Sequence, residues 1–248
     1  MTTRSRVLDE LGLGPEWVRR DRAVVSSAGA PLLSVADAGD HVVPGAAVAD
    51  PDERTESILR MDWAQLKASV AGCTACDLSR TRNRTVVGVG DEAANWLFVG
   101  EAPGADEDAQ GEPFVGQAGR LLDNMLAAIG LARGADVYIA NIVKCRPPGN
   151  RNPDAVEASC CGPYLQRQIE LLRPQLIVAL GKIAAANLLG RESTIAALRG
   201  QVHSYRGIPL IVTYHPSYLL RSLADKALAW EDLCFAVETM RRLTAAGA

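Results

Sequence analysis

The stretch "NWLFVGEAPGADEDAQGEPFVG", residues 95–116, decides how this chain folds. It begins with an unbroken apolar run, which is typical of a strand buried on both faces of a parallel sheet. The run ends at a glycine, the carboxylate of Glu101 follows, and further acidic residues crowd positions 106–112. The acids have three candidate explanations: a metal site, a phosphate-binding loop or a catalytic carboxylate.

Three later apolar runs share this character and mark further strands. They are "VYIAN" (137–141), "LIVALG" (176–181) and "LIVTYH" (210–215). The segments between them have helical spacing of apolar residues, and a last amphipathic helix is expected over about 224–244. Strands that alternate with helices in this way form a right-handed, doubly wound sheet. We therefore predict an α/β fold, a three-layer α/β/α sandwich around a central four-stranded, mainly parallel sheet.

The composition of the 248 residues divides the chain into two parts. Residues 1–53 include a long stretch rich in Ala, Gly, Ser, Pro and Asp, which predicts a flexible N-terminal extension. Residues 54–248 carry the strand and helix patterns and predict the domain that holds the functional site. No apolar run approaches the ~20 residues that span a bilayer, and the first residues contain no apolar signal core. We expect a cytoplasmic protein without membrane contacts.

Polar side chains stand at three of the four predicted strand ends. Glu101 follows the first strand, Asn141 ends the second and His215 ends the fourth. The third ends in Gly181, which leaves room at that point. Because open parallel sheets bind ligands beyond the carboxyl ends of their strands, we expect these three side chains to share one pocket.

The acidic run fits a solvated face or the first turn of a helix, where acids are favoured. A Mg²⁺ site is disfavoured because no second cluster of carboxylates appears at another strand end. A phosphate loop is rejected because its Gly-Lys-Ser is missing. We interpret Asp106 and Asp108 as parts of a solvated acidic turn.

Six cysteines in a chain that we expect in the cytoplasm point to metal or cluster binding rather than to disulfides. Cys73 and Cys76 form a C-x2-C pair, Cys145 follows the second strand, and Cys160 and Cys161 lie near the start of a helix. Four thiolates from three segments suit a [4Fe–4S] cluster or a structural zinc, and a C-x2-C pair alone also suits redox chemistry. Cys234, in the last helix, is predicted to be a small buried apolar residue.

Basic residues gather near these cysteines although the formal net charge of the chain is −3. Positive charge on loops beside a pocket predicts a groove for a polyanion such as nucleic acid. The residues are Arg80, Arg82, Arg84, Lys144, Arg146 and Arg151.

The motifs "GEAPGADEDAQGEPFVGQAG", "YIANIVKCRPPGNRNP" and "YHPSYLLRS", with the cysteine pattern, closely resemble family 4 uracil-DNA glycosylases, the iron–sulfur branch of their superfamily. The resemblance covers residues 56–244. It implies a monofunctional enzyme of base excision repair that acts on uracil in single- or double-stranded DNA, as a monomer. A DNA-binding redox sensor without turnover is an alternative. A relative that captures uracil-DNA covalently is disfavoured, because the 145–153 loop lacks a histidine.

The resemblance also implies a ligand set and a base pocket. A structural [4Fe–4S] cluster would be bound by Cys73, Cys76, Cys145 and Cys161, with Cys160 as the runner-up for the fourth ligand. Phe114 would stack on the flipped uracil, Asn141 would read its Watson–Crick edge, and Glu107 would exclude the methyl group of thymine. His215 would donate to uracil O2 as the base leaves. The family pocket further involves Gly100, Ala102 and Gly104.

Two positions mark where the resemblance leaves roles open. Other branches of the superfamily have an aspartate as the water-activating base where this chain has Ala102. Glu101 is therefore the leading candidate for positioning water or for stabilising the sugar cation. The segment "HPSYLLR" would supply a wedge, Leu219 or Leu220, that fills the gap left by the extruded nucleotide.

Overall fold

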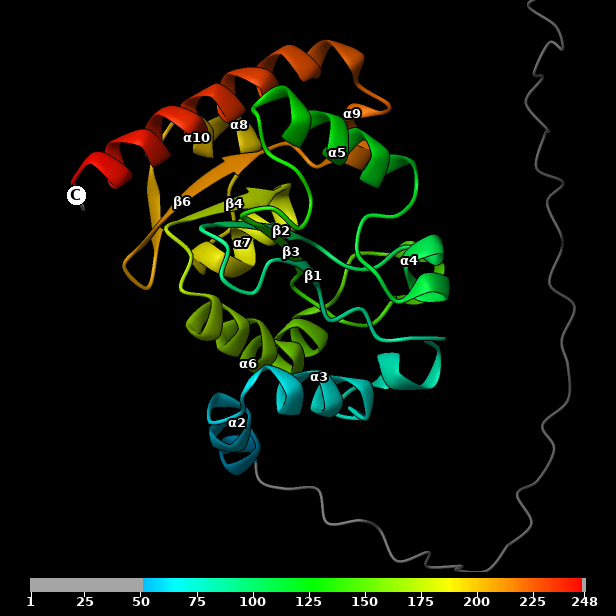
Figure 1. Ribbon diagram of the computed structural model, residues 1–248. Helices are drawn as coiled ribbons and strands as arrows, with labels where there is room; N and C mark the ends of the chain where they lie inside the picture. The colour runs from blue at the N-terminus through cyan, green and yellow to red at the C-terminus, as the bar shows by residue number, and fades with distance from the viewer. Residues whose placement is uncertain (1–50, 247–248) are drawn as a thin grey trace, which may run out of the picture. The chain divides into compact units, whose positions relative to one another are not determined.

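Four parallel strands form the centre of the fold in the computed structural model, which describes residues 51–246 (Figure 1). Almost every residue in them is buried, so their apolar runs are explained by cover on both faces. The predicted runs match these strands to within two residues. The strands are β2 (Trp96–Gly100), β3 (Val137–Asn141), β4 (Leu176–Leu180) and β6 (Ile208–Thr213).

Two short antiparallel strands, which the sequence did not predict, complete a six-stranded sheet in the order β1-β3-β2-β4-β6-β5. β1 (Val89–Gly90) has only two residues and lies beside β3. β5 (His203–Tyr205) is a polar hairpin partner of β6, joined through Arg206 and Gly207, both at positive φ. Neither has an apolar run, because an edge strand buries too little surface to need one. The chain order reverses around β2, which places a ligand crevice beyond its carboxyl end.

Helices cover both faces of the sheet, so the predicted three-layer sandwich is confirmed (Figure 1). One face packs against α5 (Gln117–Ala128) and α10 (Lys226–Ala246). The other packs against α6 (Ala155–Leu172) and α7 (Lys182–Leu189). Two further helices pack on α6 through Ile58, Leu66, Val70 and Tyr164: α2 (Pro51–Leu59) and α3 (Trp63–Ala71).

Short helical turns connect these elements at the two ends of the sheet. They are α4 (Ala105–Gln110), α8 (Ile195–Leu198), α9 (Pro216–Leu219) and the 3₁₀ turns at Asp77–Arg80, Pro148–Asn150 and Leu223–Asp225. The predicted extension over residues 1–53 lies outside the described residues except for its last three positions, which begin α2.

A capping box fixes the start of α6. The Asp154 carboxylate accepts from the Glu157 backbone N–H at 2.8 Å, and the Glu157 carboxylate accepts from the Asp154 backbone N–H at 2.9 Å. Such reciprocal bonds satisfy two backbone donors that a helix start leaves free. They fix the first turn of the helix that carries Cys160 and Cys161.

The last helix corrects one prediction, because Cys234 is exposed rather than buried. The buried positions of α10 include Ala229, Leu233 and Ala236, which share the face turned to the sheet, and Cys234 lies off that face.

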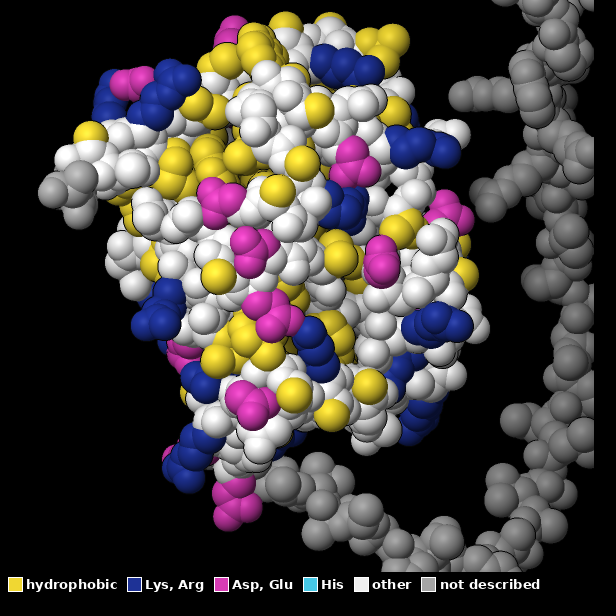
Figure 2. Space-filling view, in the orientation of Figure 1, with side chains coloured by type: hydrophobic (Ala, Val, Ile, Leu, Met, Phe, Trp, Pro, Cys, Tyr) yellow, Lys and Arg dark blue, Asp and Glu magenta, His cyan; other side chains and the backbone are white. Residues whose placement is uncertain are grey.

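Among the described residues, no helix is both long and apolar enough to cross a bilayer. Acidic and basic side chains are interspersed on the face drawn in Figure 2, with no large area of one charge.

Candidate functional site: a polar cavity at the strand ends and a cysteine cavity beside it

A cavity of about 410 Å³ opens beyond the carboxyl ends of β2, β3 and β6, and it brings Glu101, Asn141 and His215 together. Predicted neighbours Ala102, Gly104, Glu107 and Phe114 also line it. The prediction that one pocket gathers a carboxylate, an amide and an imidazole therefore agrees with the structure. Arg151, predicted for the basic groove, also lines the cavity, and the sequence missed Pro103, Ala118, Asn150, Asn152, Ser217 and Arg221 as lining residues.

Asn141 is the polar residue buried deepest in this cavity. Its side chain is buried, and its Oδ1 has no hydrogen-bond partner within the described residues. Among those residues, every other buried side-chain oxygen or nitrogen has one. Asn141 pairs with Gly100 in the parallel ladder of β2 and β3. A buried unpaired acceptor costs free energy unless a ligand satisfies it, so Asn141 Oδ1 is free to accept a hydrogen bond from a ligand.

Gly100 does not itself line the cavity but lies against two residues that do. A Cβ at this position would lie 2.5 Å from Asn141 Oδ1 and 2.6 Å from Phe114 Cζ. Only glycine lets the amide and the aromatic ring approach the strand this closely. Gly100 therefore supports Asn141 and Phe114, and its predicted contact with the substrate stays a prediction.

Phe114 is held in an uncommon conformation beside the amide. Its φ of 57° lies in the left-handed region, where residues other than glycine are uncommon. The Arg133 guanidinium donates to the Phe114 and Pro113 carbonyls at 2.8 Å each, and Gly119 packs against the Phe114 backbone. The Phe114 and His215 rings lie 5.5 Å apart between centroids. These contacts hold one aromatic face at the cavity wall.

Glu101 is a half-buried carboxylate with no hydrogen-bond or ion-pair partner within residues 51–246. Burial raises the pKa of Glu101 above its ordinary value. Its neighbour Ala102 offers no second carboxylate. Glu101 is therefore a carboxylate at the cavity, next to the strand end, that makes no bond to the described protein residues.

His215 lies two residues beyond β6 and caps the N-terminus of α9, whereas the sequence placed it at the strand end. The Ser217 backbone N–H donates to His215 Nδ1 at 3.1 Å, and Ser217 Oγ lies 2.8 Å from the same nitrogen. Nδ1 is therefore an acceptor, and the neutral ring carries its proton on Nε2. Burial, with a smaller effect of Arg221, lowers the pKa of His215 to about 4. The ring is neutral at pH 7.

Gly181 makes space for this imidazole, as the sequence predicted. Its φ of +91° is a conformation that suits glycine, and a Cβ there would lie 2.8 Å from His215 Cβ. The residue thus serves the pocket by the absence of a side chain.

The acidic run of the opening stretch divides into separate structural roles. Glu107 Oε2 accepts from the Gly104 backbone N–H at 3.0 Å, and its Oε1 accepts from Val115 and Gly116 at 3.0 and 3.2 Å. These bonds tie the start of α4 to the loop that carries Phe114. Asp106 is exposed, as predicted.

Asp108 contradicts the prediction of a solvated turn, because it is fully buried. Its carboxylate accepts from the Asn83 backbone and side-chain amides at 2.9 and 2.6 Å and from the Arg84 backbone at 3.3 Å. A buried carboxylate needs such donors, and a loop distant in sequence supplies them. Asp108 therefore pins residues 83–84 to α4.

The predicted wedge residues have opposite surroundings. Leu219, the last residue of α9, is 1% exposed and packs in the core, whereas Leu220 is 38% exposed. A side chain that fills a core position is not free to enter DNA, so the structure does not support Leu219 as a wedge. Leu220 follows α9 directly, beside the cavity residues Ser217 and Arg221.

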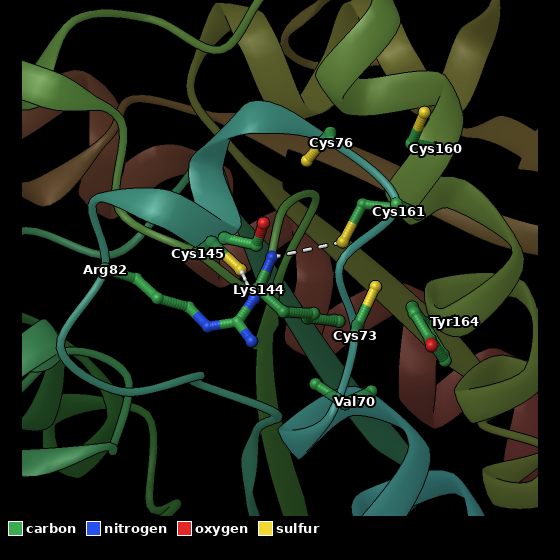
Figure 3. A pocket seen from close by; sticks show the side chains of 11 residues that line it. Val70, Cys73, Cys76, Arg82, Lys144, Cys145, Cys160, Cys161 and Tyr164 are labelled. Carbon is green, nitrogen blue, oxygen red and sulfur yellow. Dashed lines mark hydrogen bonds between the residues drawn. The ribbon is translucent and has the colours of Figure 1, made fainter. Parts of the chain in front are cut away.

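Five cysteines, all free thiols, line a second small cavity between α3, the segment after β3 and α6 (Figure 3). In Figure 3 the sulfur of Cys161 is directed into the space between Cys73, Cys76 and Cys145, and that of Cys160 is directed out of it. Burial raises the pKa values of Cys76, Cys145 and Cys161, that of Cys161 to about 12. The pKa of Cys73 is instead lowered, because the effect of burial is outweighed by hydrogen bonds that include the Ala75 backbone.

Nitrogen donors surround three of the sulfurs. Arg82 donates to Cys145 Sγ at 3.1 Å, the Lys144 backbone N–H donates to Cys161 Sγ at 3.2 Å, and Arg54 lies 3.7 Å from Cys73 Sγ. Such donors stabilise thiolates, the form that binds metals. Within residues 51–246 no three Cys, His, Asp or Glu side chains converge on one metal ion.

The predicted basic groove is corrected at Lys144, which is buried and 1% exposed. Arg82 is half-buried and engaged with Cys145 and the Ala71 carbonyl. Arg151 is exposed and donates to the buried Glu157 carboxylate through both terminal nitrogens, at 2.8 and 2.5 Å. The exposed basic side chains at the polar cavity are therefore Arg151 and Arg221, and Arg221 is a residue that sequence reasoning missed.

Comparison with known proteins agrees with this geometry. The family model of the Uracil DNA glycosylase superfamily matches residues 87–234, so the chain belongs to this superfamily. A type-4 uracil-DNA glycosylase of Archaeoglobus fulgidus is 50% identical over 159 residues, 61% of this chain and 79% of that protein. One of Thermotoga maritima is 46% identical over 168 residues, 66% of this chain and 87% of that protein. A type-5 enzyme of Pyrobaculum aerophilum is 35% identical over 147 residues, 52% of this chain and 64% of that protein. The resemblance to family 4 is confirmed.

Proposed function

We propose that this protein is a uracil-DNA glycosylase, which hydrolyses the N-glycosidic bond of deoxyuridine in DNA, releases uracil and leaves an abasic site for base excision repair. The observation that carries this proposal is the unpaired, buried Oδ1 of Asn141 in a cavity shared with Phe114 and His215. Family membership and the names of the type-4 relatives support it.

Asn141 reads the flipped base by its amide. Its Oδ1 accepts from uracil N3–H and its Nδ2 donates to uracil O4. Cytosine has no proton on N3 and carries an amine at C4, so it mismatches both groups. The unpaired acceptor is satisfied only when the correct base enters, which turns its cost in the free protein into selectivity. The Phe114 ring offers the stacking face for the same base.

His215 stabilises the leaving base. Negative charge develops on uracil O2 as the glycosidic bond breaks, and a neutral imidazole with its proton on Nε2 can donate to that oxygen. The low pKa of His215 keeps the ring neutral, so the ring does not have to lose a proton before the base binds. The two bonds from Ser217 to Nδ1 fix the tautomer and the ring plane.

Glu101 acts on the sugar side of the bond. Its carboxylate is free of protein partners among the described residues, which leaves it available to orient the attacking water or to stabilise positive charge on the deoxyribose. With Ala102 beside it, Glu101 supplies this function without a second carboxylate. The described lining of the cavity contains no lysine, so no Schiff base forms and the enzyme does not cut the strand.

Glu107 and Leu220 serve base selection and extrusion. The bonds from Glu107 to three backbone amides fix the loop wall that crowds uracil C5 and excludes the methyl group of thymine. Leu220 is the exposed wedge that fills the stack after extrusion, and Arg151 and Arg221 at the cavity contact phosphates.

Cys73, Cys76, Cys145 and Cys161 would hold a [4Fe–4S] cluster. The inward direction of the Cys161 sulfur and the backbone donor on it favour Cys161 over Cys160 as the fourth ligand (Figure 3). When bound, the cluster supplies a covalent cross-link between α3, the loop after β3 and α6, which fixes the segments beside the DNA groove.

The test is release of free uracil from a uracil-containing oligonucleotide, single- or double-stranded, without added metal. Purified protein is expected to be brown and active, and Asn141→Ala and Glu101→Ala are each expected to lose most activity while they keep their colour. A colourless, fully active protein would remove the cluster. No release from either substrate would leave a DNA-binding protein without turnover, and full activity in both variants would overturn the pocket assignment.

A further inference from the structure

Lys144 is a buried cation that the proposed reaction does not use. Its side chain is 1% exposed, and none of the ion pairs among the described residues involves it. Its Nζ donates to the Asn141 backbone carbonyl at 2.8 Å and to Gln168 Oε1 at 2.6 Å. Burial of an ammonium group without a carboxylate is costly, so its retention in this place calls for a role.

Lys144 also lies against the cysteine cavity through its backbone. The backbone N–H of Lys144 donates to Cys161 Sγ at 3.2 Å, the next residue is Cys145, and Lys144 itself lines that cavity (Figure 3). Lys144 therefore contacts Cys161 through its backbone and Asn141 through its side chain.

The backbone of Asn141 determines where its recognition amide points, because Oδ1 has no protein partner to hold it. Strand pairing fixes the residue on one side, where the Ile142 backbone N–H donates to the Gly100 carbonyl at 3.0 Å. The carbonyl of Asn141 itself is fixed by Lys144. The amide group of Asn141 thus depends on a bond supplied from the cysteine side of the molecule.

We propose that Lys144 is a positioning residue that sets Asn141 for base recognition through the hydrogen bond from its ammonium group to the Asn141 carbonyl. This inference rests on the proposed function. Its consequence is that affinity for the free base depends on Lys144, although Lys144 does not line the base cavity.

The experiment compares Lys144→Met with Gln168→Met in the intact, iron-loaded protein. The first change keeps a long apolar stem in the core and removes the bond to Asn141. The second removes the other acceptor of the same ammonium group and leaves the Asn141 bond in place. Binding of free uracil is measured by calorimetry, with iron content and thermal midpoint determined on the same samples.

Lys144→Met is expected to weaken uracil binding by about tenfold or more, the scale of one lost charge-assisted hydrogen bond, with kcat/KM reduced in parallel. Gln168→Met is expected to bind uracil within about threefold of the unchanged protein, even where its thermal midpoint falls. Unchanged uracil binding in Lys144→Met, or equal losses in both variants, would overturn the proposal. If Lys144→Met does not fold, Lys144→Leu, which also lacks a donor, serves instead and must show a loss larger than Gln168→Met. Failure of the unchanged protein to bind or release uracil would instead refute the proposed function.

Discussion

Replacement of Asn141 by alanine should remove activity without the usual loss of stability. The free protein holds Oδ1 of this side chain buried and unpaired, a state that costs about 1–3 kcal/mol. Truncation to alanine relieves that cost and loses contacts of the side-chain atoms, about 1 kcal/mol for each methylene equivalent. The free energy of unfolding is therefore expected to stay unchanged or to rise by up to about 2 kcal/mol.

Asn95→Ala is the matched control, because the Asn95 side-chain amide donates to Asp136 Oδ1 at 2.8 Å. Loss of that satisfied bond is expected to lower the free energy of unfolding by about 1 kcal/mol and to leave uracil release intact. Asn141→Ala is expected to reduce kcat/KM at least about 100-fold. Urea denaturation and the release assay decide the matter. A loss of stability in Asn141→Ala equal to that in Asn95→Ala would show that Oδ1 is satisfied in the free protein.

Three other changes test separate parts of the site. Burial lowers the pKa of His215 from 6.5 to about 4. Between these pH values the unfolded chain binds a proton at this residue and the folded protein does not. The free energy of unfolding should therefore fall by about 3 kcal/mol as pH drops from 6.5 to 4. His215→Asn should flatten this fall in urea titrations; a pH slope equal to that of the unchanged protein would refute the burial of a neutral ring. Gly100→Ala should displace Asn141 and lower uracil release at least about tenfold, because a 2.5 Å contact cannot persist, and an active variant would refute that packing. Leu219→Ala should destabilise the fold by about 2–5 kcal/mol, whereas Leu220→Ala should keep stability and slow release from duplex more than from single-stranded DNA; the reverse pattern would exchange their roles.

The sheet and the shared pocket were predictable because both follow from short local patterns. Each central strand is buried on both faces and so appears as an unbroken apolar run. Parallel strands then end at the same edge of the sheet, which is why the sequence alone could group Glu101, Asn141 and His215.

The rest depends on partners that lie far away in the sequence. Asp106 and Asp108 are alike in a helical turn, and only the approach of residues 83–84 buries one of them. From the sequence alone, Lys144 was predicted to be a charged residue on a loop. In the structure α6 covers it and places Gln168 Oε1 at its ammonium group. Ser217 was the missed residue with a local signal, since a serine two residues after a histidine can bond to it.

The pairing of Gly100 with Asn141 has a consequence for how this enzyme can diversify. If Asn141 recognises the base as proposed, recognition depends on the alignment of two adjacent strands. A shift of one residue in either strand would turn the Asn141 amide to the opposite face of the sheet. Insertions and deletions inside β2 or β3 are therefore excluded if activity is to persist. The loop from α4 to Phe114 and the segment after β6 are free of that constraint, so changes of substrate range should accumulate there.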